Sequence, residues 1–539
     1  MPLTTNDCGP KESGRNLPPL IEEVLEKPRN SRAFAAIISR NIVASLARVL
    51  VVSLVALVLP AYLTHRLPVT SYAAWVLILQ LGAYVSYFDL GIQTGVSKFV
   101  AEYDAKGDYL GAGRHASAGL LFMTLGGALG LALTAVLAWQ VPRLFRTMPA
   151  NLYHDVRLSL MLIGASLSFG LVCAVYSAVF LGLQRYWTPM TITIVNRLSY
   201  AVVIIVVVAF RGSLVAMGIA VAVVNLVTGV LQVIAWHQRA RHIPISARLM
   251  NYGALKKVTS FCSLQSVWTL AMLCIAGLDL TIVGHYDYPQ TAYYSIAILP
   301  TSFILMIMAS MLGPLMPASS AMSTQRSPQQ MGELLARITR YSTLVLLLTG
   351  LPLVIWGYPI LRLWVGPEYA LHTLTFLRIL IFANIIRNLC APYATMIVAT
   401  NRQGAAIAAA VSEAVVNLGS SIFLASRFGA IGVAIGTVLG AFVSVILHFA
   451  ITMHFTRQTL SISRAALFVK GMLRPAMVAI PSLLILPFWS ANAVDLNIPV
   501  AFAWSACTLV LGWYAVLNTT ERNDLTDLFK TRLAIATSA

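Results

Sequence analysis

Charged side chains inside long apolar stretches are the residues of this sequence best suited to chemistry. At membrane depth each such group costs about 3 kcal/mol or more, so it marks a substrate or ion pathway unless a partner explains it. The basic residues of this kind are Arg48, Arg197, Arg378 and Arg387, with Lys98 at the end of an apolar stretch. The acidic residues of this kind are Asp89, Asp279 and Glu413.

The excess of arginine over acid in these stretches favours an anionic substrate. A planar guanidinium matches phosphate oxygens in pairs, whereas a carrier of cations would more naturally show an excess of acid. We therefore predict a cationic, substrate-binding cavity at membrane depth. Its expected residues are Arg48, Arg197, Arg387, Arg378 and Lys98.

Helical spacing ranks these cations. Arg48 shares a helix face with Ser45, and Arg387 shares one with Asn384, so both would lie on polar stripes. Arg378 precedes Arg387 by nine residues, about half a turn out of phase in a helix. A straight helix cannot turn both toward one cavity, so Arg387 is favoured. For Arg378 the alternative is snorkelling toward the outer interface.

The acids leave two interpretations open. Each of Asp89, Asp279 and Glu413 could bind a coupling proton or Na⁺, or could simply neutralise an intramembrane arginine. For Arg197 the alternative to substrate binding is a tether between helices. We expect no metal site and no bound cofactor, with H⁺ or Na⁺ as the only candidate coupling ions.

The elements that must position these residues are membrane-spanning helices. Of the 539 residues 58% are hydrophobic and 10% are charged, whereas an average soluble domain is about 25% charged. This composition excludes a soluble protein. The net charge of +18 indicates basic cytoplasmic loops and anionic membrane lipids as partners, rather than nucleic acid.

Apolar stretches of about 20 residues, each long enough to cross a bilayer, predict an all-α polytopic protein with about 14 transmembrane helices. The expected spans are 41–63, 71–97, 115–141, 156–183, 188–210, 214–237, 257–284, 291–316, 338–361, 371–399, 404–426, 430–455, 468–489 and 497–518. Gly91 and Pro392 are expected to loosen or kink their spans.

The distribution of Lys and Arg sets the orientation. Most of the 37 basic residues fall on one side of the predicted spans, which places both termini in the cytoplasm. The outside loops are short, so there is no room for an extracytoplasmic catalytic domain. The sequence has no GxxxxGK[ST], GxSxG or HExxH motif, and its six Cys form no CxxC pair. We therefore expect a protein that is not an enzyme.

Short matches between the two halves indicate an internal repeat. Residues 68–72 (PVTSY) open the second span and residues 289–293 (PQTAY) open the eighth. Six spans per copy give the copies the same orientation, a transporter architecture with the substrate path between the lobes. The expected parts are a cytoplasmic tail (1–40), an N-lobe (41–237), a linker (238–256), a C-lobe (257–456), two C-terminal helices (465–518) and a second cytoplasmic tail (519–539).

One stretch carries a resemblance to a known family. Residues 88–108 (FDLGIQTGVSKFVAEYDAKGD) resemble the second-helix signature of Wzx-type polysaccharide and O-antigen flippases, in the MATE-like MOP superfamily. Residues 182–186 (GLQRY), 399–402 (ATNR) and 428–437 (FGAIGVAIGT) resemble looser family features. The resemblance implies two six-helix lobes around a central cationic cavity, plus two C-terminal helices.

The resemblance also implies a function in making a surface polysaccharide. A flippase of this type moves undecaprenyl-diphosphate-linked oligosaccharide across the bacterial inner membrane, by alternating access, for O-antigen, capsule or exopolysaccharide. Exchange for H⁺ or Na⁺ occurs in some members. A polysaccharide polymerase and a chain-length regulator are the expected protein partners. The alternatives are a MATE-type cation-coupled drug exporter and a membrane-embedded glycosyltransferase or polysaccharide polymerase.

Overall fold

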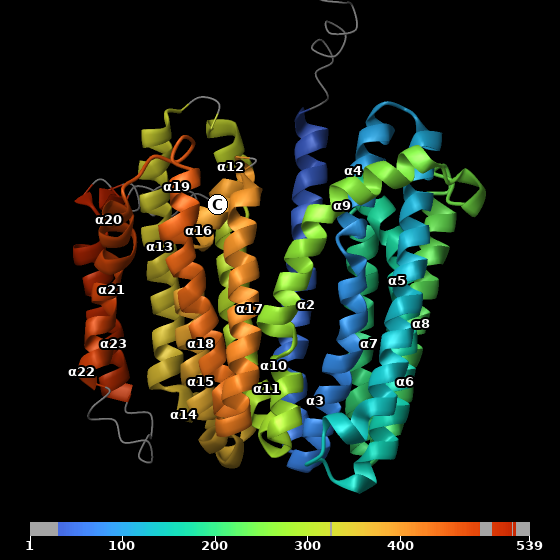
Figure 1. Ribbon diagram of the computed structural model, residues 1–539, viewed down its shortest axis with the longest axis horizontal. Helices are drawn as coiled ribbons and strands as arrows, with labels where there is room; N and C mark the ends of the chain where they lie inside the picture. The colour runs from blue at the N-terminus through green and yellow to red at the C-terminus, as the bar shows by residue number, and fades with distance from the viewer. Residues whose placement is uncertain are drawn as a thin grey trace, which may run out of the picture.

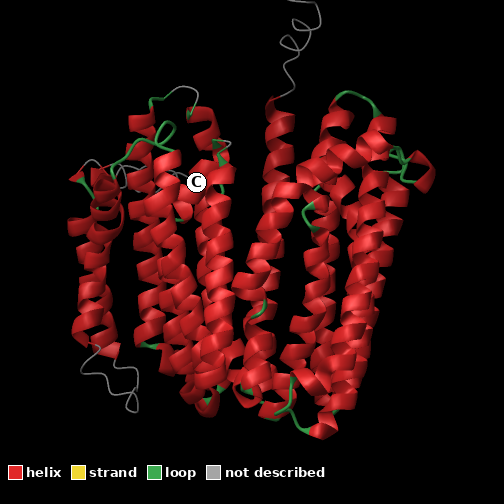
Figure 2. Ribbon diagram, in the orientation of Figure 1, coloured by secondary structure: helices red, strands yellow, loops and turns green. Residues whose placement is uncertain are grey.

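The computed structural model describes residues 31–323, 326–400, 402–485, 498–519, 521–523 and 526. Throughout this part of the chain the regular structure is helical, without strands, which confirms the predicted all-α polytopic class (Figure 2). Twelve of its helices are long and apolar enough to cross a membrane, and a shorter apolar helix covers Phe502–Val516. Most of the N-terminal tail, residues 1–30, lies outside the described residues.

The first half of the chain forms one bundle, at the right of Figure 1. Its helices are α2 (Ser31–Thr64), α3 (Val69–Ala83), α4 (Ile92–Ala105), α5 (Tyr109–Leu144), α6 (Tyr153–Gly182), α7 (Trp187–Ala209) and α8 (Leu214–Arg239). Small residues allow close packing where these helices cross. A Cβ at Gly164 would lie 2.2 Å from Thr134 of α5, and one at Gly218 would lie 2.9 Å from Ser159 of α6.

The second half forms the other bundle. Its helices are α9 (Tyr252–Met272), α10 (Asp279–Tyr286), α11 (Thr291–Leu312), α12 (Leu315–Met322), α13 (Pro328–Ile355), α14 (Gly357–Val365), α15 (Pro367–Asn388), α16 (Ala391–Ala399), α17 (Gln403–Phe428), α18 (Ala430–Leu447) and α19 (Met453–Phe455). Figure 1 shows α9 crossing obliquely to the first bundle. Contacts of α9 with both α4 and α17 make it a bridge between the halves.

The C-terminal helices pack on the outside of the second bundle. Residues 464–485 run through α20 (Arg464–Leu467), a π segment (Phe468–Leu473), α21 (Arg474–Ala476) and α22 (Ile480–Ile485), and α23 (Ile498–Leu511) follows. Trp504 of α23 meets Trp356 edge to face at 4.7 Å between ring centroids. Glu521 forms a buried ion pair with Arg340 of α13, which ties this segment to the bundle.

Several predicted spans are broken rather than straight. A 3₁₀ segment (Tyr84–Asp89) separates α3 from α4, and the chain then turns through left-handed backbone at Leu90 (φ 48°) and Gly91 (φ 80°). Span 10 breaks between α15 and α16, where Pro392 occupies the first turn of α16. Both breaks lie where glycine or proline predicted a kink. A π segment (Leu273–Gly277) between α9 and α10 is a third break, which the sequence analysis did not predict although the segment ends in a glycine.

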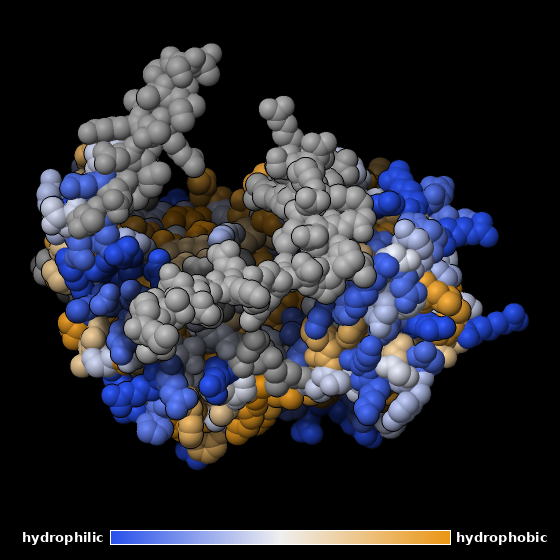
Figure 3. Space-filling view, turned by 90° about the horizontal axis from the view of Figure 1, so that it is seen from above, coloured by the Kyte–Doolittle hydropathy of each residue, from blue (hydrophilic) through white to orange (hydrophobic). Residues whose placement is uncertain are grey.

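Viewed onto the end where α2 begins, apolar residues lie in a hollow between two hydrophilic rims (Figure 3). At the opposite end the two bundles converge in Figure 1 and hydrogen bonds join them. The hydroxyl of Tyr288 donates to the Thr70 carbonyl at 2.7 Å, and Trp364 Nε1 donates to the Leu57 carbonyl at 2.7 Å. The molecule is therefore closed at the end away from the start of α2.

Candidate functional site

An arginine and a glutamate from different helices meet inside the second bundle. Nε of Arg387, on α15, donates to Oε1 of Glu413, on α17, at 2.5 Å. The two side chains are 17% and 5% exposed. A second nitrogen of the same guanidinium, Nη2, is buried and has no hydrogen-bond partner within the described residues. Arg387 is therefore neutralised by Glu413 but not saturated with acceptors.

Asp279 adds a second carboxylate to this cluster. It opens α10 directly after the π segment, and its side chain is buried. Oδ2 accepts from the Thr437 hydroxyl of α18 at 3.3 Å, while Oδ1 has no partner in the described part of the chain. Arg387 acts on this carboxylate electrostatically. The cluster thus joins two acids and one arginine from α10, α15, α17 and α18.

Arg48 and Arg197 lie in the first bundle. Arg48 of α2 is half-buried, and its Nε is buried without a hydrogen-bond partner among the described residues. Arg197 of α7 is exposed. No ion pair joins either residue to an acid in the residues that the structure describes. These two cations therefore lack the compensation that Arg387 has.

Arg378 is placed differently from Arg387. Its Nε donates to the Val354 carbonyl near the end of α13 at 3.0 Å, and the side chain is half-buried. A guanidinium bonded to a backbone carbonyl fastens α15 to α13. The structure brings Arg378 to this carbonyl and brings Arg387 to Glu413, so the two side chains have separate partners.

Asp89 lies at the break in the second span, where the 3₁₀ segment ends and α4 is about to begin. Its Oδ1 accepts from the backbone N–H of Gln93 at 3.0 Å, in the first turn of α4. Helix starts leave such N–H groups without intrahelical partners, so a side-chain oxygen there acts as a cap. Within the described residues Asp89 is in no ion pair. This places it apart from the Arg387–Glu413–Asp279 cluster.

A groove of about 280 Å³ lies between the two bundles, where α9 bridges α4 and α17. Its lining residues are Thr94, Phe261, Gln265, Trp268, Val398, Ala406 and Ile407. Lys98 of α4 lies beside it, with Nζ 4.2 Å from the centroid of the Phe261 ring. Apart from Lys98, sequence reasoning missed this groove, because its residues are ordinary helical positions until α9 crosses the gap.

The residues that close the opposite end were also missed. Tyr72 and Tyr293, which occupy equivalent places in the two repeat motifs, both contact Tyr369 edge to face, at 6.0 and 5.2 Å between ring centroids. The repeat motif was the signal that could have found them. Asp287 lies nearby in the turn after α10, and partial burial raises the pKa of its carboxyl above the usual range.

Comparison with solved structures defines the fold. The chain superimposes on the lipid II flippase MurJ in an inward closed conformation, with a TM-score of 0.67, 14% identity, and coverage of 87% of this chain and 98% of that one. It also superimposes on an inward-facing MATE family multidrug resistance transporter, with a TM-score of 0.59, 16% identity, and coverage of 75% and 96%. The protein is therefore a multi-pass membrane protein with the fold of MOP-superfamily transporters.

A third similar structure widens the range of functions on this fold. A MOP-superfamily transporter from Pyrococcus furiosus aligns with a TM-score of 0.56, 15% identity, and coverage of 78% of this chain and 96% of that one. No protein-family model and no curated protein matches the sequence. At these identities the comparisons establish the fold, and the choice of substrate depends on the site.

Proposed function

We propose that this protein is a flippase that exports undecaprenyl-diphosphate-linked oligosaccharide for surface polysaccharide synthesis. The observation that carries the proposal is that two of the predicted cavity arginines, one in each half, have a buried nitrogen without a hydrogen-bond partner in the described residues, Nε of Arg48 and Nη2 of Arg387. A buried donor without an acceptor is costly, and phosphate oxygens are the acceptors that guanidinium groups match best. A diphosphate crossing between the lobes would supply them.

The sugar units and the prenyl chain of the proposed substrate also match features of the structure. The groove beside Lys98 combines two aromatic rings with the amide of Gln265 and the hydroxyl of Thr94, a lining that suits sugar rings and hydroxyl groups. An apolar prenyl chain has no need to enter a polar cavity and would stay in lipid. Alternating access would then carry only the head group across the membrane.

The setting of this activity is the bacterial inner membrane, with both termini in the cytoplasm. The hollow at the end where α2 begins would then face the cytoplasm, where lipid-linked units are assembled. A polysaccharide polymerase and a chain-length regulator would act on the exported units. Anionic lipids would contact the basic loops on the cytoplasmic side.

Coupling to an ion is a second part of the proposal. The cluster of Asp279, Glu413 and Arg387 holds two acids against one arginine, so one proton or one Na⁺ would balance its charge. Uptake of that proton or ion would weaken the hold of the acids on Arg387 and free it for a phosphate. This links the coupling ion to the substrate through one guanidinium.

The alternatives have less support from these residues. A MATE-type drug exporter shares the fold, but an excess of intramembrane arginine disfavours a cationic cargo. A glycosyltransferase or polymerase needs catalytic groups beside the lipid donor. The short predicted outside loops leave little room for them.

The proposal is tested with Arg48→Gln, because no acid in the described part of the chain forms an ion pair with Arg48 whose loss would disturb folding. We expect a deletion strain that expresses this variant to lose surface glycan and to accumulate lipid-linked oligosaccharide on the cytoplasmic leaflet. Expression of the natural protein should restore display. The loss is expected to be tenfold or more, because removal of one charge-assisted hydrogen bond costs about 1.5–3 kcal/mol.

Arg427→Gln is the matched control, since Arg427 is exposed at the closed end, where its guanidinium lies 4.9 Å from the centroid of the Phe423 ring. This variant should display normal glycan at the same membrane abundance. Normal display by both variants would refute the role of Arg48. Normal display by the deletion strain itself would refute the proposed function.

A further inference from the structure

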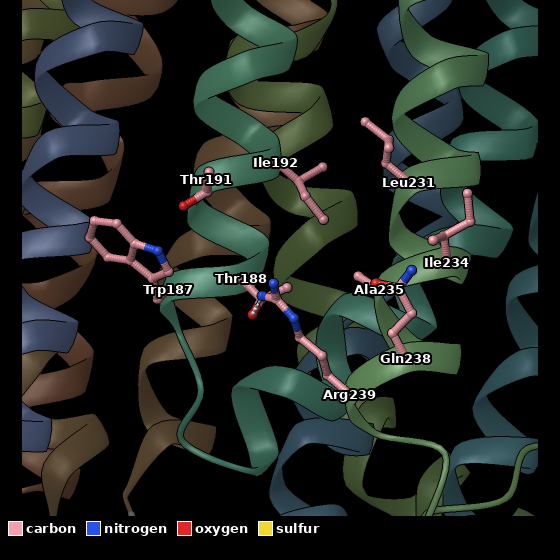
Figure 4. Close-up of a pocket in the computed structure, with 9 residues that line it drawn as sticks. All are labelled: Trp187, Thr188, Thr191, Ile192, Leu231, Ile234, Ala235, Gln238 and Arg239. Carbon is pink, nitrogen blue, oxygen red and sulfur yellow. Dashed lines mark hydrogen bonds between the residues drawn. The ribbon is translucent and has the colours of Figure 1, made fainter.

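A pocket outside the proposed transport path lies between α7 and α8. It has a volume of about 300 Å³ and sits where α7 begins and α8 ends (Figure 4). Its lining residues are Trp187, Thr188, Thr191, Ile192, Leu231, Ile234, Ala235, Gln238 and Arg239. It shares no residue with the groove between the lobes.

Basic and polar groups gather at one end of this pocket. Arg239 points across the gap toward Thr188 in Figure 4, and its Nη1 donates to the Thr188 hydroxyl at 3.4 Å. Arg185 lies beside it and donates from Nη1 to the Arg239 carbonyl at 2.8 Å. A guanidinium has five N–H donors, and Arg239 uses one of them within the described residues. The lining contains no acid.

The other end of the pocket is apolar and leads along the helices. Ile192, Leu231 and Ile234 line it beyond the polar group. Both helices continue with exposed apolar side chains, such as Val195 and Val202 on α7 and Val223 and Val227 on α8. In a membrane protein such a surface faces the hydrocarbon of the bilayer. Trp187, 48% exposed, lies at the boundary where tryptophan marks the membrane interface.

We propose that this pocket binds an anionic phospholipid of the surrounding bilayer. The phosphate accepts hydrogen bonds from Arg239 and Thr188, and Arg185 adds a second positive charge. One acyl chain lies along Ile192 and Leu231. A basic pocket between transmembrane helices with a continuous apolar wall has the chemistry that holds an anionic lipid head group. The site lies on the N-lobe in the leaflet where α7 begins.

The inference is tested by lipid titration of the purified full-length protein, followed by native mass spectrometry. The probes are phosphatidylglycerol and phosphatidylcholine with identical acyl chains. We expect the natural protein to retain phosphatidylglycerol at least tenfold more tightly. Arg239→Gln should weaken phosphatidylglycerol binding by about tenfold, as expected for one charge-assisted hydrogen bond, and leave phosphatidylcholine unchanged. Thr188→Val should weaken it by a smaller factor.

Arg241→Gln is the control, because Arg241 is an exposed arginine two residues further on that does not line the pocket. It should bind phosphatidylglycerol like the natural protein. Equal loss in Arg241→Gln and Arg239→Gln would reduce the effect to bulk charge and overturn the site. Equal retention of both lipids by the natural protein would overturn it as well. Neither readout depends on the transported substrate.

Discussion

At the scale of single residues, the Arg387–Glu413 pair is the contact on which both stability and the proposed coupling depend. Removal of one partner leaves the other buried without its ion-pair partner, whereas removal of both leaves only the Asp279 carboxylate, so the net charge of the cluster is unchanged. We expect Arg387→Met and Glu413→Leu each to lower the free energy of unfolding by about 3–5 kcal/mol. The double variant should regain most of that loss, as thermal unfolding of the purified protein in a double-mutant cycle would measure.

Arg378→Met provides the comparison for this cycle. Arg378 lies on the same helix but bonds a backbone carbonyl instead of an acid, so its loss strands no charge. Its cost should be about 1–3 kcal/mol and should add to that of Glu413→Leu. If the effects of Arg387→Met and Glu413→Leu also add, the two residues are not coupled. The proposed coupling ion would then have no guanidinium to release.

The sequence predicted that several charged residues are buried, but it did not predict their partners. The sequence identified Arg387 and Glu413 as buried charges, but it left open whether Glu413 binds an ion or neutralises an arginine. The partners lie on separate helices, and only helix packing brings them to 2.5 Å. Asp89 was singled out for its charge alone, yet the structure shows it capping α4. That role depends on the helix break at Leu90 and Gly91, between Asp89 and its partner Gln93.

At the scale of elements, the break between α3 and α4 holds the bridge helix α9 in place. Gly91 has a left-handed φ of 80°, and a Cβ added there would lie 2.3 Å from Cγ of Gln265 on α9. The Cys262 thiol of α9 donates to the Gly91 carbonyl at 3.5 Å, and the Ser266 hydroxyl, which donates to the Cys262 carbonyl at 2.9 Å, also lies 3.4 Å from the Leu90 carbonyl. Glycine therefore serves both the backbone turn and the close approach of α9.

Gly91→Ala should lower the stability of the protein by more than the cost of placing alanine at a positive φ. Gly107 gives the matched control, since its φ of 71° carries the same penalty but nothing lies within 4 Å of its Cβ position. We expect Gly107→Ala to cost about 1 kcal/mol and Gly91→Ala to cost about 1–3 kcal/mol more, because α9 must shift. Melting temperatures of the two variants in detergent measure the difference. Equal melting temperatures would mean that α9 is not held at this turn.

Hydropathy placed the twelve long spans because each must hide about 20 residues of backbone in lipid. Glycine and proline placed the breaks at Gly91 and Pro392. The π segment before Asp279 ends at Gly277, but a single glycine inside an apolar span did not distinguish this break from a continuous helix. The sequence therefore predicted the helices well but could not show where the bridge helix passes.

At the scale of the whole molecule, the closed end is held by hydrogen bonds between the two halves. Tyr288 is fully buried, and its hydroxyl donates to the Thr70 carbonyl across the interface. Gln80 Nε2 donates to the Gly277 carbonyl at 2.6 Å in the same region. Opening this end must break such bonds. Their loss should therefore shift the balance toward the state that is open there.

Tyr288→Phe removes one of these bonds with little change in volume. It removes the hydrogen bond to the Thr70 carbonyl, which costs the closed state about 0.5–1.5 kcal/mol and raises the ratio of open to closed molecules roughly 2- to 13-fold. Spin labels at Arg146→Cys and Arg427→Cys, on opposite halves at this end, would report longer distances in a background without the six natural cysteines. Double electron–electron resonance measures that distribution directly.

Tyr62→Phe separates opening from a general loss of packing. The Tyr62 hydroxyl donates to the Ile205 carbonyl at 3.4 Å, but α2 and α7 both belong to the first bundle, so this bond does not cross the interface. The variant should leave the label distances unchanged. An equal shift in Tyr62→Phe, or none in Tyr288→Phe, would mean that hydrogen bonds across this interface do not hold the molecule closed. Alternating access would then need another latch, for which the Tyr72–Tyr369–Tyr293 contacts are the next candidates.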